Sequence, residues 1–117
     1  MKKDMITIFL LSSLLILLSG CNTTEASISR RCSSRITENS SVSFSAQKGD
    51  KINIKYDSKV EKGDLEIQLI DINKDVIKNF ETNSKGNRKI KINKTGEYIL
   101  RVSLDRFKGN VNVKAQK

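Results

Sequence analysis

The chain of 117 residues contains no histidine, no proline and no tryptophan, and it has only two cysteines. Without histidine it cannot form a Ser-His-Asp or Cys-His nucleophile system, or a zinc or iron site built on imidazole. It has no glycine-rich phosphate-binding loop, and no spacing marks two of its carboxylates as a glycosidase pair. We therefore predict that the chain is not an enzyme and that it uses no metal and no cofactor.

Aromatic residues are scarce as well, at 5% of the chain. Beyond residue 20 they are Phe44, Tyr56, Phe80, Tyr98 and Phe107. They form no ladder on which bases or sugars could stack, and we expect no nucleic-acid partner. Tyr56 and Tyr98 stand within alternating apolar residues, so we expect both in the core.

The one long apolar run lies at the N-terminus, where Lys2 and Lys3 precede the uncharged stretch from Met5 to Leu18. As a helix this stretch would measure about 21 Å, which is short of the ~30 Å hydrocarbon core of a bilayer. A basic start, a short apolar centre and small residues after it are typical of a signal peptide. The alternative is an ordinary membrane anchor.

The run ends in Leu18, Ser19, Gly20 and Cys21, and this tetrad resembles the bacterial lipoprotein box. The resemblance implies that residues 1–20 are a signal peptide and that Cys21 receives a diacylglycerol and further acylation, such as palmitate. Two or more acyl chains anchor a protein stably, because each buried methylene contributes ~0.8 kcal/mol. We therefore expect a lipid anchor at the extracytoplasmic face of the cell membrane. A secretory signal followed by an incidental cysteine is the alternative.

Removal of residues 1–20 would take away Lys2, Lys3 and Asp4 and leave a net charge of +8. A basic surface favours anionic partners, such as phospholipid head groups or cell-envelope polymers. The alternative is a solvated, lysine-rich surface without a role. Lipidation of Cys21 would leave Cys32 as an odd cysteine, which implies an intermolecular disulfide or a free thiol.

Residues 22–40 are polar, aperiodic and rich in serine and threonine. This composition predicts that residues 21–40 comprise the lipidated cysteine and a disordered tether. A coil of this length reaches roughly 25 Å. We therefore expect the folded domain, residues 41–117, to stay close to the membrane.

From Ser41 onward apolar residues alternate with polar ones, which indicates strands with one buried face. The alternating runs are 42–44, 52–56, 65–69, 76–80, 90–92, 98–104 and 111–115. Glycine-containing turn signals separate them at 48–50, 62–64, 83–87, 94–96 and 108–110. The spacing predicts an all-β fold, an antiparallel and jelly-roll-like β-sandwich of about seven strands.

Two local patterns stand out in the middle of the domain. Leu69 and Ile70 fall on opposite parities, so either a bulge re-aims the strand or both of its faces are covered. Asp71–Asp75 begins like a calcium loop, but Val76 and Thr82 stand where an EF-hand requires glycine and glutamate. We interpret this segment as a hairpin turn.

The stretch 44–102 contains Lys-Gly-Asp-Lys-Ile-Asn-Ile, Gly-Asp-Leu-Glu-Ile-Gln-Leu-Ile-Asp and Thr-Gly-Glu-Tyr-Ile-Leu-Arg-Val. These segments resemble the jelly-roll domains of bacterial pre-peptidase C-terminal type and, more loosely, GOLD-like sandwiches. Small lipoproteins of Gram-positive bacteria often carry such a domain alone. The resemblance implies that Tyr98, in the strand after Gly96, plugs the end of the sandwich. It implies no catalytic residue.

Basic residues occupy the polar positions of several predicted strands, and we take them as candidate contacts for an anionic ligand: Lys51, Lys55, Lys89, Lys91, Arg101 and Lys114. The sequence leaves open whether they share one sheet face. We predict a membrane-anchored binding or accessory module for anionic envelope polymers or lipid head groups. The alternative is a structural or interaction lipoprotein that serves a partner envelope protein.

Overall fold

The computed structural model describes residues 23–117. The predicted signal peptide, its cleavage motif and Cys21 lie outside the described residues. The described chain forms five strands: β1 (Thr24–Ala46), β2 (Lys51–Asp71), β3 (Val76–Phe80), β4 (Lys85–Lys91) and β5 (Gly96–Gln116). All neighbouring strands are antiparallel, in the order β1-β5-β2-β3, and β4 also pairs with β2. The expectation of an all-β, antiparallel fold is confirmed.

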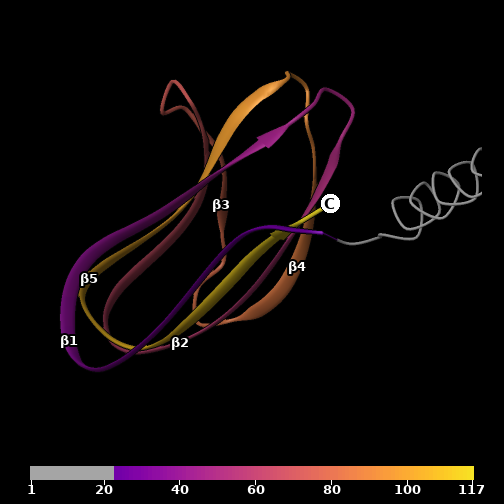
Figure 1. Ribbon diagram of the computed structural model, residues 1–117. Helices are drawn as coiled ribbons and strands as arrows, with labels where there is room; N and C mark the ends of the chain where they lie inside the picture. The colour runs from indigo at the N-terminus through magenta and orange to yellow at the C-terminus, as the bar shows by residue number, and fades with distance from the viewer. Residues whose placement is uncertain (1–22) are drawn as a thin grey trace, which may run out of the picture.

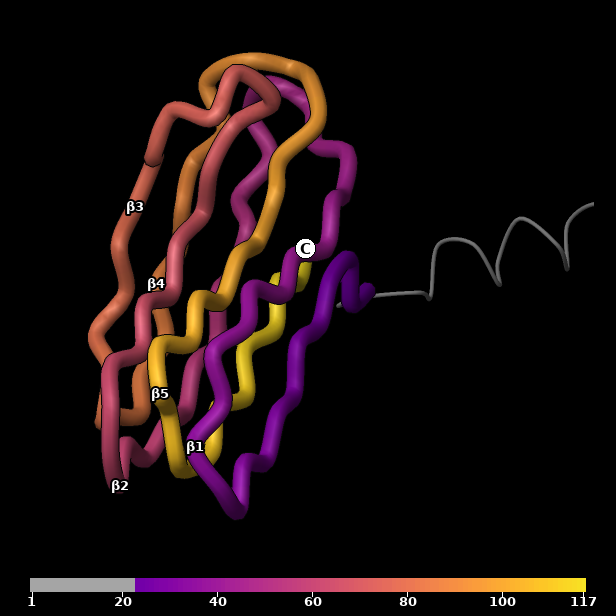
Figure 2. The backbone as a smooth tube through the Cα atoms, turned by 90° about the vertical axis from the view of Figure 1, so that its left-hand side faces the viewer, coloured from indigo at the N-terminus to yellow at the C-terminus, as the bar shows by residue number. Residues whose placement is uncertain are grey.

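Three of the strands are long, and each bends back near its middle, at the lower left of Figure 1. The bends divide the sheet into two arms. The first arm contains residues 24–32, 109–116, 51–60 and 85–91, in that order across the sheet. The second arm contains residues 36–46, 96–104, 65–71 and 76–80. Figure 2 shows that β3 and β4 lie on the same side of the folded sheet, away from β1.

Glycines at the bends explain why the seven expected runs form five strands. Gly63 and Gly109 both have positive φ, and a Cβ at either would lie 2.0 Å from a backbone oxygen of the neighbouring strand. Register shifts in the β2–β5 pairing surround Lys62. The segments 62–64 and 108–110, predicted as turns between strands, are therefore bends within β2 and β5.

The expectation of a disordered tether is wrong for residues 24–40, which form the larger part of β1. Apolar and polar residues do alternate here: Ala26, Ile28 and Cys32 are buried, and polar side chains stand between them. The pattern is weak because the apolar residues are few or small. Pairing with β5 supplies the remaining stabilisation of the strand, since most of β1 from Thr24 to Ala46 is in register with β5. A polar sequence is tolerated because β1 is an edge strand.

The core lies between the two arms and takes alternate residues from each long strand. Its largest fully buried side chains are Phe107, Ile52, Ile54, Ile67, Leu69, Ile92, Leu100, Val102, Val111 and Val113. Tyr56 and Tyr98 are also buried, as expected. The Tyr98 hydroxyl donates a hydrogen bond to the Lys94 carbonyl, and its ring lies 6.2 Å from that of Phe44.

The middle of the second arm resolves the two local patterns. Residues Ile67–Ile70 of β2 are all buried, so both faces of the strand are covered there, and a register shift with β3 falls between Leu69 and Ile70. Asp71 then closes a hairpin turn, as predicted. Its Oδ1 accepts hydrogen bonds from the backbone N–H groups of Asn73 and Asp75.

Candidate anion-binding face

The outer surface of the first arm carries a concentration of lysines on three adjacent strands. Because Ile52, Ile54 and Tyr56 point into the core, the residues between them point outward. Residues directly opposite them on β4 and β5 share that side of the sheet. We call this surface the basic face; it consists of Lys51, Asn53, Lys55, Asp57, Lys85, Asn87, Lys89, Lys91, Asn112, Lys114 and Gln116.

The pairing register arranges these side chains in transverse rows. Lys51 lies opposite Lys91, and Asn53 lies between Lys89 and Gln116. The next two rows are Asn87, Lys55 and Lys114, and then Lys85, Asp57 and Asn112. Neighbours across a row are about 4.8 Å apart, and successive rows are about 7 Å apart along the strands. Each row therefore contains at least one lysine.

Five of the six basic residues proposed from the sequence lie on this face, and Arg101 does not. The bend in β5 places Arg101 in the second arm, opposite Ser41 and Gln68. There its guanidinium donates a hydrogen bond to Gln68 Oε1. The strand pattern could not show this separation, because it treated the two halves of β5 as independent strands.

The sequence pattern did not reveal Lys85 and Asn87 as strand residues, because Gly86 between them is typical of a turn. In the structure β4 begins at Lys85, and Gly86 lies opposite Tyr56. A Cβ at Gly86 would lie 2.3 Å from the Tyr56 hydroxyl oxygen. Glycine is present because the tyrosine ring occupies the space of a side chain. Continuing the alternation back from Lys89 and Lys91 would have identified both residues.

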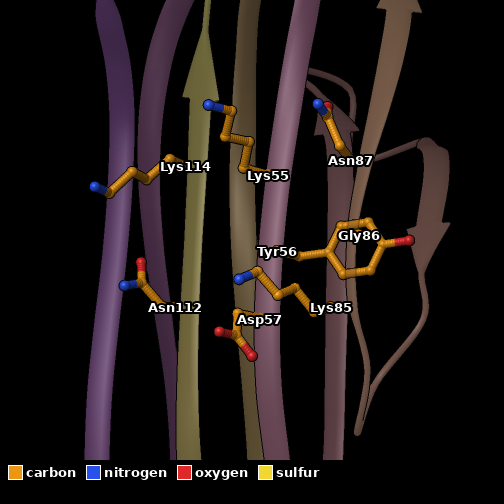
Figure 3. A pocket seen from close by; sticks show the side chains of 8 residues that line it. All are labelled: Lys55, Tyr56, Asp57, Lys85, Gly86, Asn87, Asn112 and Lys114. Carbon is orange, nitrogen blue, oxygen red and sulfur yellow. The ribbon is translucent and has the colours of Figure 1, made fainter.

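Two shallow hollows run along the basic face and share Lys55. One, of about 480 Å³, is lined by Lys55, Tyr56, Asp57, Lys85, Gly86, Asn87, Asn112 and Lys114. Figure 3 shows its three ammonium groups together with the Asp57 carboxylate and the two asparagine amides. The other, of about 340 Å³, is lined by Lys51, Asn53, Lys55, Lys89, Gln116 and Lys117.

The positive charge of this face is largely unneutralised. The basic face has six lysines and one carboxylate, that of Asp57. Among residues 23–117, four ion pairs form, and none involves a lysine of the face. At the end of the basic face where Lys51 lies, Lys117 Nζ is 3.4 Å from Asp50 Oδ2. The pKa of Asp50 is lowered, first by the Gln47 backbone N–H and then by Lys117.

Beside the basic face, at the β4 edge of the first arm, Arg88 and Glu81 form an ion pair. The Arg88 guanidinium donates a hydrogen bond of 3.0 Å to Glu81. The Tyr56 hydroxyl and then the Glu81 carboxylate raise the pKa of Arg88 above its ordinary value. The Tyr56 ring also contacts Phe80, with centroids 5.7 Å apart. These contacts join β4 to the segment that follows β3.

The side chains of the basic face are suited to binding anions. Ammonium and carboxamide groups donate hydrogen bonds to anionic and hydroxyl oxygens. In the described part of the chain no cluster of three metal-ligating side chains occurs. The exposed large apolar residues Ile72, Val76 and Ile77 belong to the hairpin of β2 and β3, outside this face.

Comparison with known proteins leaves the chain without an assigned family. No protein-family model matches it, and no curated protein matches it significantly. Residues 23–117 contain no helix with the length and apolarity needed to cross a bilayer.

Proposed function

We propose that this protein is a membrane-anchored extracytoplasmic lipoprotein that acts as a binding or accessory module for anionic envelope polymers or lipid head groups. The observation that supports this proposal is the gathering of six lysines around a single carboxylate on one sheet face. Potentials of such close charges add within the Debye length of about 8 Å at physiological salt. A flexible polyanion could contact several rows at once.

The proposed anchor is Cys21, after removal of residues 1–20. Because β1 begins at Thr24, only Asn22 and Thr23 separate Cys21 from the sheet. The three residue steps from Cys21 to Thr24 span at most about 11 Å, less than half of the roughly 25 Å coil of the expected tether. Thr24 lies opposite Gln116, which belongs to the basic face. The face would therefore begin at the anchored end and stay near the membrane surface.

We further propose that the folded sheet corresponds to a jelly-roll-like sandwich of the pre-peptidase C-terminal type. Support comes from the two arms enclosing one core. The seven runs of the sequence are the strand segments of these arms, with the first half of β1 as an addition. The Tyr98 contact with the Lys94 carbonyl is consistent with the expected end plug.

A second function is favoured by a different surface. Ile72, Val76 and Ile77 are 58%, 47% and 40% exposed in the β2–β3 hairpin. Such residues are typical of a protein interface, so a structural lipoprotein that serves a partner envelope protein is the alternative. Recovery of one stoichiometric protein partner from solubilised membranes, lost in Ile72→Ser/Ile77→Ser, would favour this alternative.

The proposed function is tested by binding of the full chain, held in neutral-lipid nanodiscs, to anionic polymers at low and at physiological salt. Lys55→Glu/Lys89→Glu should weaken binding by roughly thirtyfold or more, because each basic residue near an anionic surface contributes ~1 kcal/mol. The control is Lys62→Glu/Lys78→Glu, two exposed lysines outside the face. Equal losses in both variants would mean that net charge, and not the basic face, causes the binding.

A further inference from the structure

Cationic and carboxamide side chains alternate along most of the basic face, and the alternation ends at Asp57 on β2 and at Lys91 on β4. On β2 the outward order is Lys51, Asn53, Lys55 and Asp57; on β4 it is Lys85, Asn87, Lys89 and Lys91. On β5, Lys114 lies between Asn112 and Gln116. The amides therefore lie between the charges, in the same rows and in the same hollows.

From this alternation we infer that the face binds a linear phosphodiester polymer of a polyol, lying along the strands. This inference rests on the proposed function and names its ligand. Lysine ammonium groups pair with the phosphodiesters, and the amides of the asparagines and of Gln116 bond the hydroxyl groups between them. Lysines on one strand are about 14 Å apart, but every row contains a lysine on one of the three strands, so an extended chain meets a lysine about every 7 Å.

The hollows supply the path for such a chain. They adjoin at Lys55, and together they extend along the face from Lys51 and Lys89 to Lys85 and Asn112. Asn53 lines one of these hollows, and its Oδ1 has no hydrogen-bond partner within residues 23–117. A shielded acceptor without a donor is costly. The Asn53 side chain must rotate toward the hollow before a ligand hydroxyl can donate to this oxygen.

Two other polyanions fit the face less well. A bilayer surface would favour apolar side chains that insert between head groups, but the exposed large apolar residues lie in the β2–β3 hairpin. Single-stranded nucleic acid would favour exposed aromatic rings on which bases stack. The aromatic residue beneath the face, Tyr56, is 4% exposed and held under Gly86.

The test uses the full chain in nanodiscs of neutral lipid, titrated with poly(glycerol phosphate), inorganic polyphosphate and single-stranded DNA of matched charge. Poly(glycerol phosphate) should bind about tenfold more tightly than polyphosphate, since only it offers hydroxyls to the amides. Asn87→Ala/Asn112→Ala should weaken poly(glycerol phosphate) binding more than polyphosphate binding and so remove most of this preference. Both residues are exposed, so their replacement leaves the core intact.

The outcomes separate the inference from the proposed function. Equal affinity for the three polymers, or tighter binding of DNA, would overturn the inference and leave an anion-binding face. The inference would also be overturned, in favour of lipid head groups, if phosphatidylglycerol in the nanodisc competed with poly(glycerol phosphate) as strongly as added polyphosphate does. No binding of any polymer at low salt, with no effect of phosphatidylglycerol, would contradict the proposed function itself.

Discussion

The Arg30 guanidinium holds the Glu38 carboxylate through two hydrogen bonds, of 2.8 and 2.7 Å, across the bend of β1. Arg30 belongs to the first arm and Glu38 to the second, so the pair joins the two arms at the free edge of the sheet. At the opposite side, Arg88 and Glu81 make a similar link between β4 and the end of β3. An arginine–glutamate pair thus bridges each side of the folded sheet.

This pair predicts a pH dependence of stability. The hydrogen bonds from Arg30 lower the pKa of Glu38, so the ionised carboxylate stabilises the fold above its unfolded pKa of about 4.3. That contribution is lost as pH falls through the lower, folded pKa. Glu38→Gln should therefore reduce the free energy of unfolding at pH 7, and its difference from the wild type should shrink in acid.

Urea unfolding at pH 7 and in the range below pH 4 measures this difference. Glu66→Gln is the control, because Glu66 is exposed and forms no ion pair with another described residue. A Glu38→Gln deficit that stays constant down to acid pH would show that the pair does not act through its charge.

Gly86 and Tyr56 provide a test of packing under the basic face. Gly86→Ala places a methyl group 2.3 Å from the Tyr56 hydroxyl oxygen and 2.5 Å from Cζ, so the buried ring must move. Overpacking of this kind costs about 1–3 kcal/mol. Gly96→Ala is the matched control, because a Cβ there meets no atom within 4 Å. Thermal unfolding should show a lowered midpoint for Gly86→Ala alone; equal midpoints would place Tyr56 elsewhere.

Cys32 should be protected from thiol reagents in the folded protein. It is a free cysteine that is 3% exposed and lies opposite Gly109 at the bend. This burial disfavours an intermolecular disulfide, which was one of the two expectations for a single remaining cysteine. In a Cys21→Ala chain, labelling should occur only through opening of the fold and accelerate strongly in urea. Labelling in buffer as fast as in urea would mean that β1 is not docked on β5.

Lipidation is tested at Cys21. We expect Cys21→Ala to abolish incorporation of labelled fatty acid and to move the protein out of the detergent phase, because the acyl chains supply the anchor. Ser33→Ala, a change at an exposed residue of β1, serves as the control and should remain lipidated. Unchanged membrane retention of Cys21→Ala would identify the apolar segment from Met5 to Leu18 as the anchor.

The alternation of apolar residues after Ser41 was sufficient to predict an antiparallel all-β fold and the outward position of five lysines. It could not distinguish a glycine that ends a strand from one that bends it, because both need the same backbone freedom; Gly63 and Gly109 are of the second kind. It also missed β1 before Ser41, where the pairing with β5, rather than local hydrophobicity, stabilises the strand. The first reason explains why the sequence could not show that Arg101 lies apart from the other five, and the second why the tether was predicted too long.

Anion binding to the basic face can be followed residue by residue in backbone amide NMR spectra of the ¹⁵N-labelled protein titrated with poly(glycerol phosphate). If the polymer lies on the basic face, shift changes should concentrate at residues 51–57, 85–91 and 112–116 and disappear as salt is raised. Shift changes confined to the second arm or to the β2–β3 hairpin, or none at low salt, would contradict it.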